Sequence, residues 1–338
     1  MTLKSIFIVG TILTVLVACS NDPLDVDISE TKVDINFIDM DSAFVHSDSI
    51  NLMKRCSEYK KSIKDIYEYE LGHCIGIGRV SDSILYDTLS GFLDHPYTAR
   101  LEARIHTKFS DKTEIRENIR NGFKHLKFHF PTVKQPKNIV FLNSVFTGSA
   151  ISMEDDIAVG LERYLGPDVD VIKELPPNEF FQWIKEAMDA QFLERDVMAS
   201  WIMTNVVENP NGGSLAENIV YWGKIIYFIE ASFPDQEEHI IIRYSDEDYK
   251  WAVDNEYSYW EYLVAQNLLF KLDERTKMNM LKEGPFTPGL PEIGPDRLGQ
   301  FLGWRMVHQY MENHSDLSLS ELNNKGYNDI LQEYEIED

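Results

Sequence analysis

The chain has 338 residues, of which 32 are basic and 56 acidic, so its formal net charge is −24. Hydrophobic residues make up 43% of the chain, which is enough for a sizeable core and excludes wholesale disorder. Nucleic-acid binding is disfavoured because a charge of this sign repels phosphate.

The charge is unevenly distributed along the chain. Residues 1–50 hold 2 basic and 8 acidic residues (−6), residues 51–137 hold 16 and 11 (+5), and residues 138–338 hold 14 and 37 (−23). We expect the basic segment to pack against the acidic remainder. The region 138–338 is then the place where a cationic partner would bind.

The N-terminal segment has the charged, apolar and small-residue regions of an export signal, in that order. Lys4 precedes an apolar run over residues 6–18, which ends in Leu16-Val17-Ala18-Cys19. A helix of this length spans about 20 Å and is too short for a hydrocarbon core of about 30 Å. The last four residues resemble the lipobox of bacterial lipoproteins, whose cysteine is acylated and becomes the first residue after cleavage. This predicts a signal peptide over residues 1–18 and a lipid anchor at Cys19.

Two further cysteines, Cys56 and Cys74, are too few for a disulfide framework, and no CxxC motif is present. We favour two thiols over a disulfide between them, although export would permit the disulfide.

The elements follow in chain order. Residues 19–45 are acidic and only mildly apolar, which predicts a tether that ends in a strand over 33–38. Helical spacing of apolar residues predicts helices over 47–70, 81–94 and 112–129, the last two being followed by Pro96 and Pro131. Apolar runs at 138–143, 150–153 and 157–161 predict three strands with tight connections.

From residue 178 onward the pattern is mostly helical. The predicted helices cover 178–207, 214–232, 246–270, 273–282, 297–313 and 318–332. A small, mainly antiparallel sheet among many helices predicts the α+β class, with a single domain over 46–332 and an acidic tail over 333–338.

The helix over 214–232 carries two informative features. Ser214 followed by Glu217 has the pattern of a capping box. Gly223 lies in mid-helix, where glycine costs about 1 kcal/mol relative to alanine. We therefore expect another backbone to approach closely at this point.

Several distinctive segments, each occurring once, follow one another along the chain. They are Glu162-Arg163-Tyr164-Leu165-Gly166, Tyr221-Trp222-Gly223-Lys224, Asn255-Glu256 with Trp260, Gly284-Pro285-Phe286, Pro295 through Gly299, and Gly303-Trp304-Arg305 with Tyr310-Met311. Together with the lipobox, the series resembles the GldB-type gliding-motility lipoproteins of Bacteroidetes. The resemblance implies a lipid-anchored scaffold or accessory of an envelope machinery, with protein partners in the envelope. Ser20 after the cysteine does not resemble an inner-membrane retention signal, so we expect the outer membrane, on its periplasmic face or at the cell surface.

The resemblance also implies a distant, zincin-like relation to zinc-peptidase domains, which carry His-Glu-x-x-His on a helix behind a small sheet. Here Glu217, Asn218 and Tyr221 occupy those three positions, so the helix supplies no imidazole for zinc. His125 and His129 have the spacing of zinc ligands, but Leu126 replaces the glutamate that would activate water. We therefore expect a non-catalytic protein with no metal and no cofactor.

Four polar residues form the candidate cleft cluster, namely Glu217, Tyr221, Lys224 and Glu256. They would converge if the helices pack as the resemblance implies, either to hold those helices in register or to line a partner groove. One alternative is a hydrolase whose non-zinc centre uses Glu217, Glu256 and His308. Another is a surface lipoprotein that binds a nutrient or a glycan.

Overall fold

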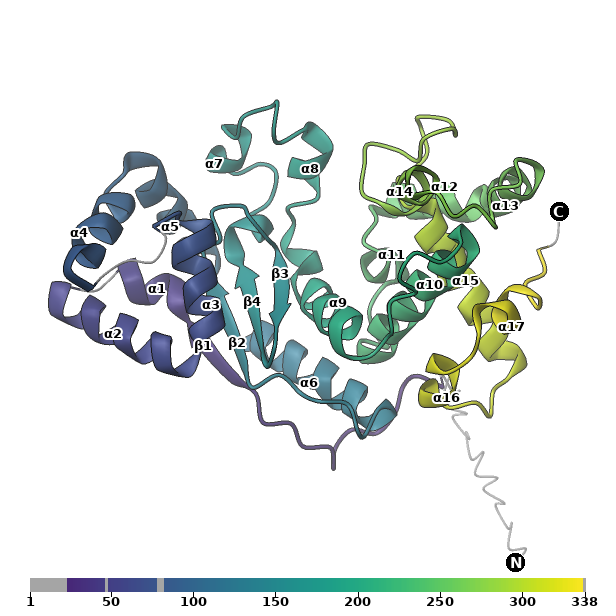
Figure 1. Cartoon of the computed structure of the whole chain (residues 1–338), viewed down its shortest axis with the longest axis horizontal. Coiled ribbons are helices and arrows are strands. Elements are labelled where there is room, and N and C mark those ends of the chain that lie inside the picture. Colours follow the sequence, from purple (N-terminus) through teal and green to yellow (C-terminus); the bar gives the residue numbers. More distant parts are fainter. Residues whose placement is uncertain (1–22, 46–47, 78–81, 337–338) are drawn as a thin grey trace, which may run out of the picture.

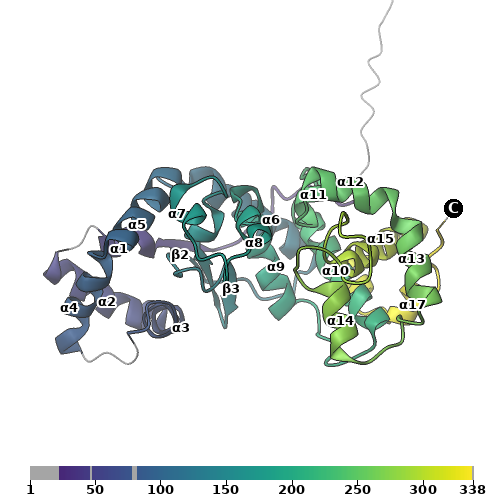
Figure 2. The ribbon, with the colours of Figure 1, turned by 90° about the horizontal axis from the view of Figure 1, so that it is seen from above.

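The computed structural model describes residues 23–45, 48–77 and 82–336. Cys19 and the predicted signal peptide lie outside the described residues. The molecule is elongated, with α1–α5 at one end and α12–α17 at the other (Figures 1 and 2). Across the described residues, no helix combines the length and the apolar character needed to cross a membrane.

The sheet has four strands, β1 (Asn36–Asp39), β2 (Asn138–Leu142), β3 (Ala150–Met153) and β4 (Asp156–Gly160), in the order β1-β2-β4-β3. β2 runs parallel to β1 and to β4, and only β3 is antiparallel to β4. The prediction of a mainly antiparallel sheet is therefore wrong, because the sheet is mixed. The long helical connection from β1 to β2 allows a parallel pair, whereas a turn at Glu154 and Asp155 joins β3 and β4 as a hairpin.

Both faces of the sheet are covered, because successive strand residues point to opposite sides. Ile139, Phe141 and Val159 belong to a large core that also contains residues of α5, α6 and α9. Val140 and Leu142 belong to a smaller core formed with α2, α3 and α4. The strands are apolar on both faces for this reason.

The helices before β2 are α1 (Met40–Val45), α2 (Ser49–Ser62), α3 (Lys64–Tyr69), the π-helical turn η1 (Glu70–Cys74), α4 (Asp82–Leu93), α5 (Pro96–Lys108) and α6 (Thr113–His129). The predicted helix over 47–70 is divided at Ile63, whose backbone is not helical. The sequence reasoning missed α5, since it treated Pro96 only as a helix stop. Pro96 is instead the first residue of α5, a position where its missing N–H is harmless.

The elements after β4 are η2 (Leu161–Tyr164), α7 (Asp170–Lys173), α8 (Gln182–Glu186), η3 (Ala190–Phe192), α9 (Leu193–Asn205), α10 (Leu215–Ser232), α11 (Glu238–Ile241), α12 (Asp246–Asp254), α13 (Glu256–Ala265), α14 (Glu274–Leu281), α15 (Leu298–Asn313), α16 (Leu319–Asn323) and α17 (Tyr327–Leu331). Three predicted helices are divided, namely 178–207, 246–270 and 318–332. The others agree to within a residue or two, and Ser214 accepts a hydrogen bond from the Glu217 N–H at 3.3 Å as the N-cap of α10.

Both ends of the described chain are packed more closely than the sequence indicates. Leu24, Ile35 and Met40 of the predicted tether are buried, and β1 is an integral strand of the sheet. Tyr334 of the predicted acidic tail is 8% exposed. The boundaries expected at residues 46 and 332 therefore do not mark where packing begins and ends, because a few apolar residues within each acidic stretch join the core.

Ion pairs link the basic segment to acidic residues on both sides of it. Arg104 binds Asp170 at 2.9 Å, and Lys112 binds Asp39 at 3.3 Å. Lys134 and Lys137 both bind Asp155 in the β3–β4 turn. The expected packing of residues 51–137 against acidic segments is thus present at these contacts.

Candidate functional site

Helix α10 is the centre of the C-terminal half, and it crosses α15 in backbone contact. A Cβ built on Gly223 would lie 2.1 Å from the carbonyl oxygen of Gly303, and one built on Gly303 would lie 2.0 Å from that of Ile219. Only glycines fit at such a crossing. The close approach expected from Gly223 is confirmed, and the partner is the helix that carries the Gly303-Trp304-Arg305 segment.

The structure does not bring the four residues of the candidate cleft cluster together. Lys224 is 7% exposed, and its Nζ donates to the carbonyl oxygens of Asn323 and Lys325, at 3.0 and 2.7 Å. Burial lowers the pKa of Lys224 to about 8. Glu217 is partly buried beside Gly213 near the start of α10. Tyr221 is buried, and burial raises the pKa of its hydroxyl.

Glu256 belongs to a different site. Its carboxylate accepts hydrogen bonds from Nε of Arg305 at 2.9 and 3.1 Å and from the Tyr334 hydroxyl at 2.6 Å. These contacts fasten α13 and the C-terminal segment to α15. Because Lys224 and Glu256 have separate partners, they join helices and segments in two different places.

Of the alternative hydrolase centre, Glu256 and His308 line one cavity of about 420 Å³, whereas Glu217 does not line it. His308 Nε2 lies 2.6 Å from a carboxylate oxygen of Glu230, which also accepts a hydrogen bond from the Trp304 indole at 2.7 Å. The histidine ring packs edge-on against Trp304 and Tyr227. Its carboxylate partner is therefore Glu230, not Glu217 or Glu256.

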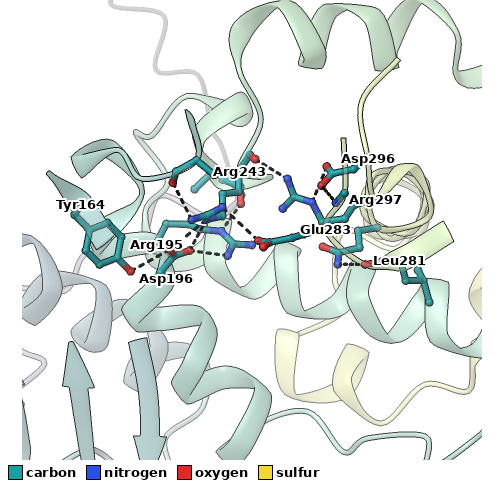
Figure 3. Close-up of polar contacts among 12 residues, drawn as sticks. Tyr164, Arg195, Asp196, Arg243, Leu281, Glu283, Asp296 and Arg297 are labelled. Atoms are coloured by element: carbon teal, nitrogen blue, oxygen red, sulfur yellow. Dashed lines mark hydrogen bonds and ion pairs between the residues drawn. The ribbon is translucent and has the colours of Figure 1, made fainter. Parts of the chain in front are cut away.

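The sequence reasoning missed a buried arginine network, shown in Figure 3. At its centre Asp196, in the first turn of α9, is 7% exposed. Its carboxylate accepts hydrogen bonds at 3.1 Å from Arg195 Nη1, from Arg243 Nε and from the Tyr164 hydroxyl. Burial alone would raise the pKa of Asp196, but the charges of Arg243 and Arg195 outweigh burial and lower it. The carboxylate is therefore ionised at neutral pH.

The network continues toward α15 through two arginines with left-handed backbone conformations. Arg243 and Arg297 have φ values of 65° and 50°. Arg297 donates from Nε to Asp296 at 2.8 Å and from Nη2 to the carbonyl oxygen of Arg243 at 2.9 Å. Arg243 also binds Glu283 at 3.3 Å. Guanidinium groups stay charged at any physiological pH, so this chain of contacts holds fixed positive charges between α9 and α15.

A cavity of about 320 Å³ lies beside this network, between the start of β3, α9 and the junction of α14 with α15. Its charged lining residues are Arg163, Arg195, Asp196, Arg243, Lys282, Glu283 and Arg297. The lining thus has five cationic side chains and two carboxylates. Arg195 also borders a larger cavity of about 520 Å³, but the carboxylates there are Glu194 and Asp235, so that cavity has no excess of positive charge.

The helix that lies behind the sheet is also not the one expected. Helix α9 packs along β3 and β4 (Figure 1), whereas α10 lies against α15, α9 and α6. Glu217, Asn218 and Tyr221 therefore lie on a helix that does not pack along the sheet. No histidine occurs in α9, and the cavity beside it is lined by Arg195 and Asp196.

Of the spaced histidines of α6, His125 is buried and His129 is partly buried. Burial lowers the pKa of His125, and it lowers the pKa of His129 to about 4. Within the ranges that the structure describes, no three side chains of histidine, cysteine, aspartate or glutamate form a group suited to a metal ion.

The fold and the site define a predominantly helical α+β protein with buried polar contacts between its helices and a cationic cavity beside the sheet. The chain belongs to the family described as "Gliding motility protein GldB", whose profile matches residues 21–335. Membership associates the protein with gliding motility, and the family's designation as lipoproteins suggests the cell envelope. The chain has no match among curated proteins or among solved structures. The zincin-like likeness therefore stays a prediction.

Proposed function

We propose that this protein is a lipid-anchored, non-catalytic component of the outer membrane that serves a gliding-motility machinery as a scaffold or accessory. The family match supports the motility role, and the lipobox ending at Cys19 supports the anchor. The observation that carries the non-catalytic role is the use of the polar side chains in the C-terminal half. Lys224, Glu256 and His308 are each committed to contacts that hold helices or chain segments together.

The arginine network supports the same role. An arginine that stays protonated at all physiological pH values cannot act as a general base, and Asp196 is held ionised by two such groups. This chemistry suits binding and positioning better than proton transfer. We further propose envelope proteins as partners, with the −23 charge of residues 138–338 favouring a cationic one.

The anchor is tested by replacing Cys19 with alanine in the full-length gene. We expect the variant to lose its acyl chains and to leave the membrane fraction, because one cysteine carries the whole anchor. Cys56→Ser is the matched control and should stay membrane-bound. An acylated, membrane-bound Cys19→Ala protein would overturn the assignment.

The non-catalytic role is tested by complementation of a deletion strain. Glu217→Gln removes the carboxylate of the predicted cluster without changing its size, so we expect it to restore motility or envelope function as well as the wild type does. Purified protein that holds stoichiometric zinc, and that loses a peptidase activity on chelation, would contradict the proposal. Affinity capture from membranes then identifies the partners.

A further inference from the structure

We propose that the 320 Å³ cavity beside the arginine network binds a compact oxyanion, either a carboxylate or a phosphate group. This inference builds on the proposed binding role, because the cavity would hold its ligand without changing it.

The first argument is the concentration of positive charge. Residues 138–338 contain 14 basic residues, and five of them line this one cavity. The lining also contains two carboxylates, Asp196 and Glu283, so the cavity has an excess of three positive charges. Asp296 lines the adjoining cavity and pairs with Arg297. If its carboxylate is counted as well, an excess of two positive charges remains. In a region whose net charge is −23, an anion would find this cavity the favourable place to bind.

The second argument is that two of the cations have no partner in the described structure. The side chains of Arg163, after β4, and of Lys282, after α14, make no hydrogen bond or ion pair with any described residue. Arg163 is partly buried and Lys282 is exposed. Both line the cavity, so both are available to a ligand. A guanidinium group with a full set of unused donors matches the planar, bidentate geometry of carboxylates and phosphates.

The third argument is that the remaining cations are held in place before any ligand arrives. Arg243 is fixed by Asp196 and Glu283, and by a 3.1 Å hydrogen bond from Nη2 to the Ala187 carbonyl oxygen. Arg195 is fixed by Asp196 and by the carbonyl oxygen of Ile241 at 2.9 Å. A site whose cations are already ordered loses little conformational entropy on binding.

The rest of the lining sets the size and character of the ligand. Small and apolar side chains also line the cavity, namely those of Ala150, Ala199, Met203 and Trp222. A charged group with a short apolar portion therefore fits better than a long polyanion. The two sources of this chemistry are a small carboxylic acid, such as the end of a peptide, and a small phosphate ester or free phosphate.

The experiment measures binding to the full acylated chain in detergent micelles by calorimetry at low ionic strength. The probes are inorganic phosphate, N-acetyl-leucine and its uncharged amide. We expect one of the anions to bind the wild type, and Arg163→Gln and Lys282→Gln each to weaken that binding about tenfold or more. Arg275→Gln, on the exposed side of α14 and away from the cavity, is the matched control and should bind like the wild type.

The anion that binds identifies the source of the oxyanion. The inference is overturned if neither anion binds, if the amide binds as well as the acid, or if Arg163→Gln keeps wild-type affinity. Arg163→Gln should fold normally, because its side chain has no partner to lose, and a thermal unfolding curve verifies this. Hydrolysis of N-acetyl-leucine would instead overturn the non-catalytic role and leave the oxyanion site intact. The result of the Cys19→Ala experiment concerns the lipid anchor alone and does not bear on the oxyanion site.

Discussion

The crossing of α10 and α15 at Gly223 gives the sharpest stability prediction. A Cβ at Gly223 would lie 2.1 Å from the Gly303 carbonyl oxygen, whereas ordinary van der Waals contact begins at 3.4 Å. The helices must therefore separate locally by about 1.3 Å (3.4 − 2.1) to admit alanine. Both the added atom and its neighbour are fixed to backbone, so no change of side-chain rotamer relieves the clash.

The energetic cost follows from that separation. A gap of 0.5–1 Å already forfeits a quarter to a half of the dispersion energy between facing atoms. Overpacking of a core costs about 1–3 kcal/mol, and a contact between two backbones belongs at the upper end of that range. Alanine returns about 1 kcal/mol through its better helix propensity. We expect Gly223→Ala to lower the free energy of unfolding by about 2 kcal/mol.

Urea unfolding followed by tryptophan fluorescence measures this loss. With a denaturant slope of about 3 kcal/mol/M, the midpoint should fall by roughly 0.7 M. Gly91→Ala is the matched control, because Gly91 is an exposed residue of α4 with no atom within 4 Å of an added Cβ. That variant should gain up to about 1 kcal/mol. If Gly223→Ala were as stable as the wild type while the control gained stability, the backbone contact between α10 and α15 would be refuted.

Three further predictions concern buried polar groups. Asp196→Asn should lower the free energy of unfolding by about 3–5 kcal/mol, because it leaves the buried guanidinium of Arg195 without the carboxylate that pairs with it; a loss below about 1 kcal/mol in urea would contradict this. Burial raises the pKa of Glu102 from 4.5 to about 7, so between these pH values the folded protein keeps a proton that the unfolded chain releases. The stability that this bound proton contributes is lost as the pH rises from 4.5 toward 7. Glu102→Gln should remove that part of the pH dependence and exceed the wild type by up to about 3 kcal/mol near pH 8, whereas an unchanged pH profile would show that Glu102 is ionised throughout. Cys56 and Cys74 form no disulfide and are buried, and burial raises the pKa of Cys74 to about 12. A chromogenic thiol reagent should therefore label both cysteines only after unfolding. Fast labelling of Cys74 in the folded protein would contradict its burial.

The features that the sequence predicts well are local or have a single physical cause. Ser214 before an apolar helical pattern identifies the start of α10, because capping depends on residues three positions apart. A glycine inside a helix is costly unless the space beside it is occupied, so Gly223 predicts the helix crossing. The apolar run of β2 predicts a strand, because a strand buried on both faces has no polar side.

The features that the sequence misses depend on tertiary contacts. Strand direction is decided by how the long helical connection between β1 and β2 runs, which apolar patterning does not encode. The arginine network depends on left-handed backbones at Arg243 and Arg297, a conformation that side-chain patterns do not indicate for arginine. Lys224 and Glu256, both of the predicted cluster, are buried but lie in separate contacts. Their partners, including two backbone carbonyl oxygens, could not be named without the fold.

The arginine network is hard to explain by stability alone. Removing buried charges from water costs several kcal/mol per ion, and well-packed apolar residues often stabilise such a position as well as an ion pair does. Its three arginines are balanced by the carboxylates of Asp196, Glu283 and Asp296, so the excess positive charge in the cavity comes from the two cations beside the network, Arg163 and Lys282. An arriving anion would pair with these two cations beside arginines that are already ordered. The acidity of the rest of the region 138–338 then disfavours non-specific binding of anions elsewhere on that region.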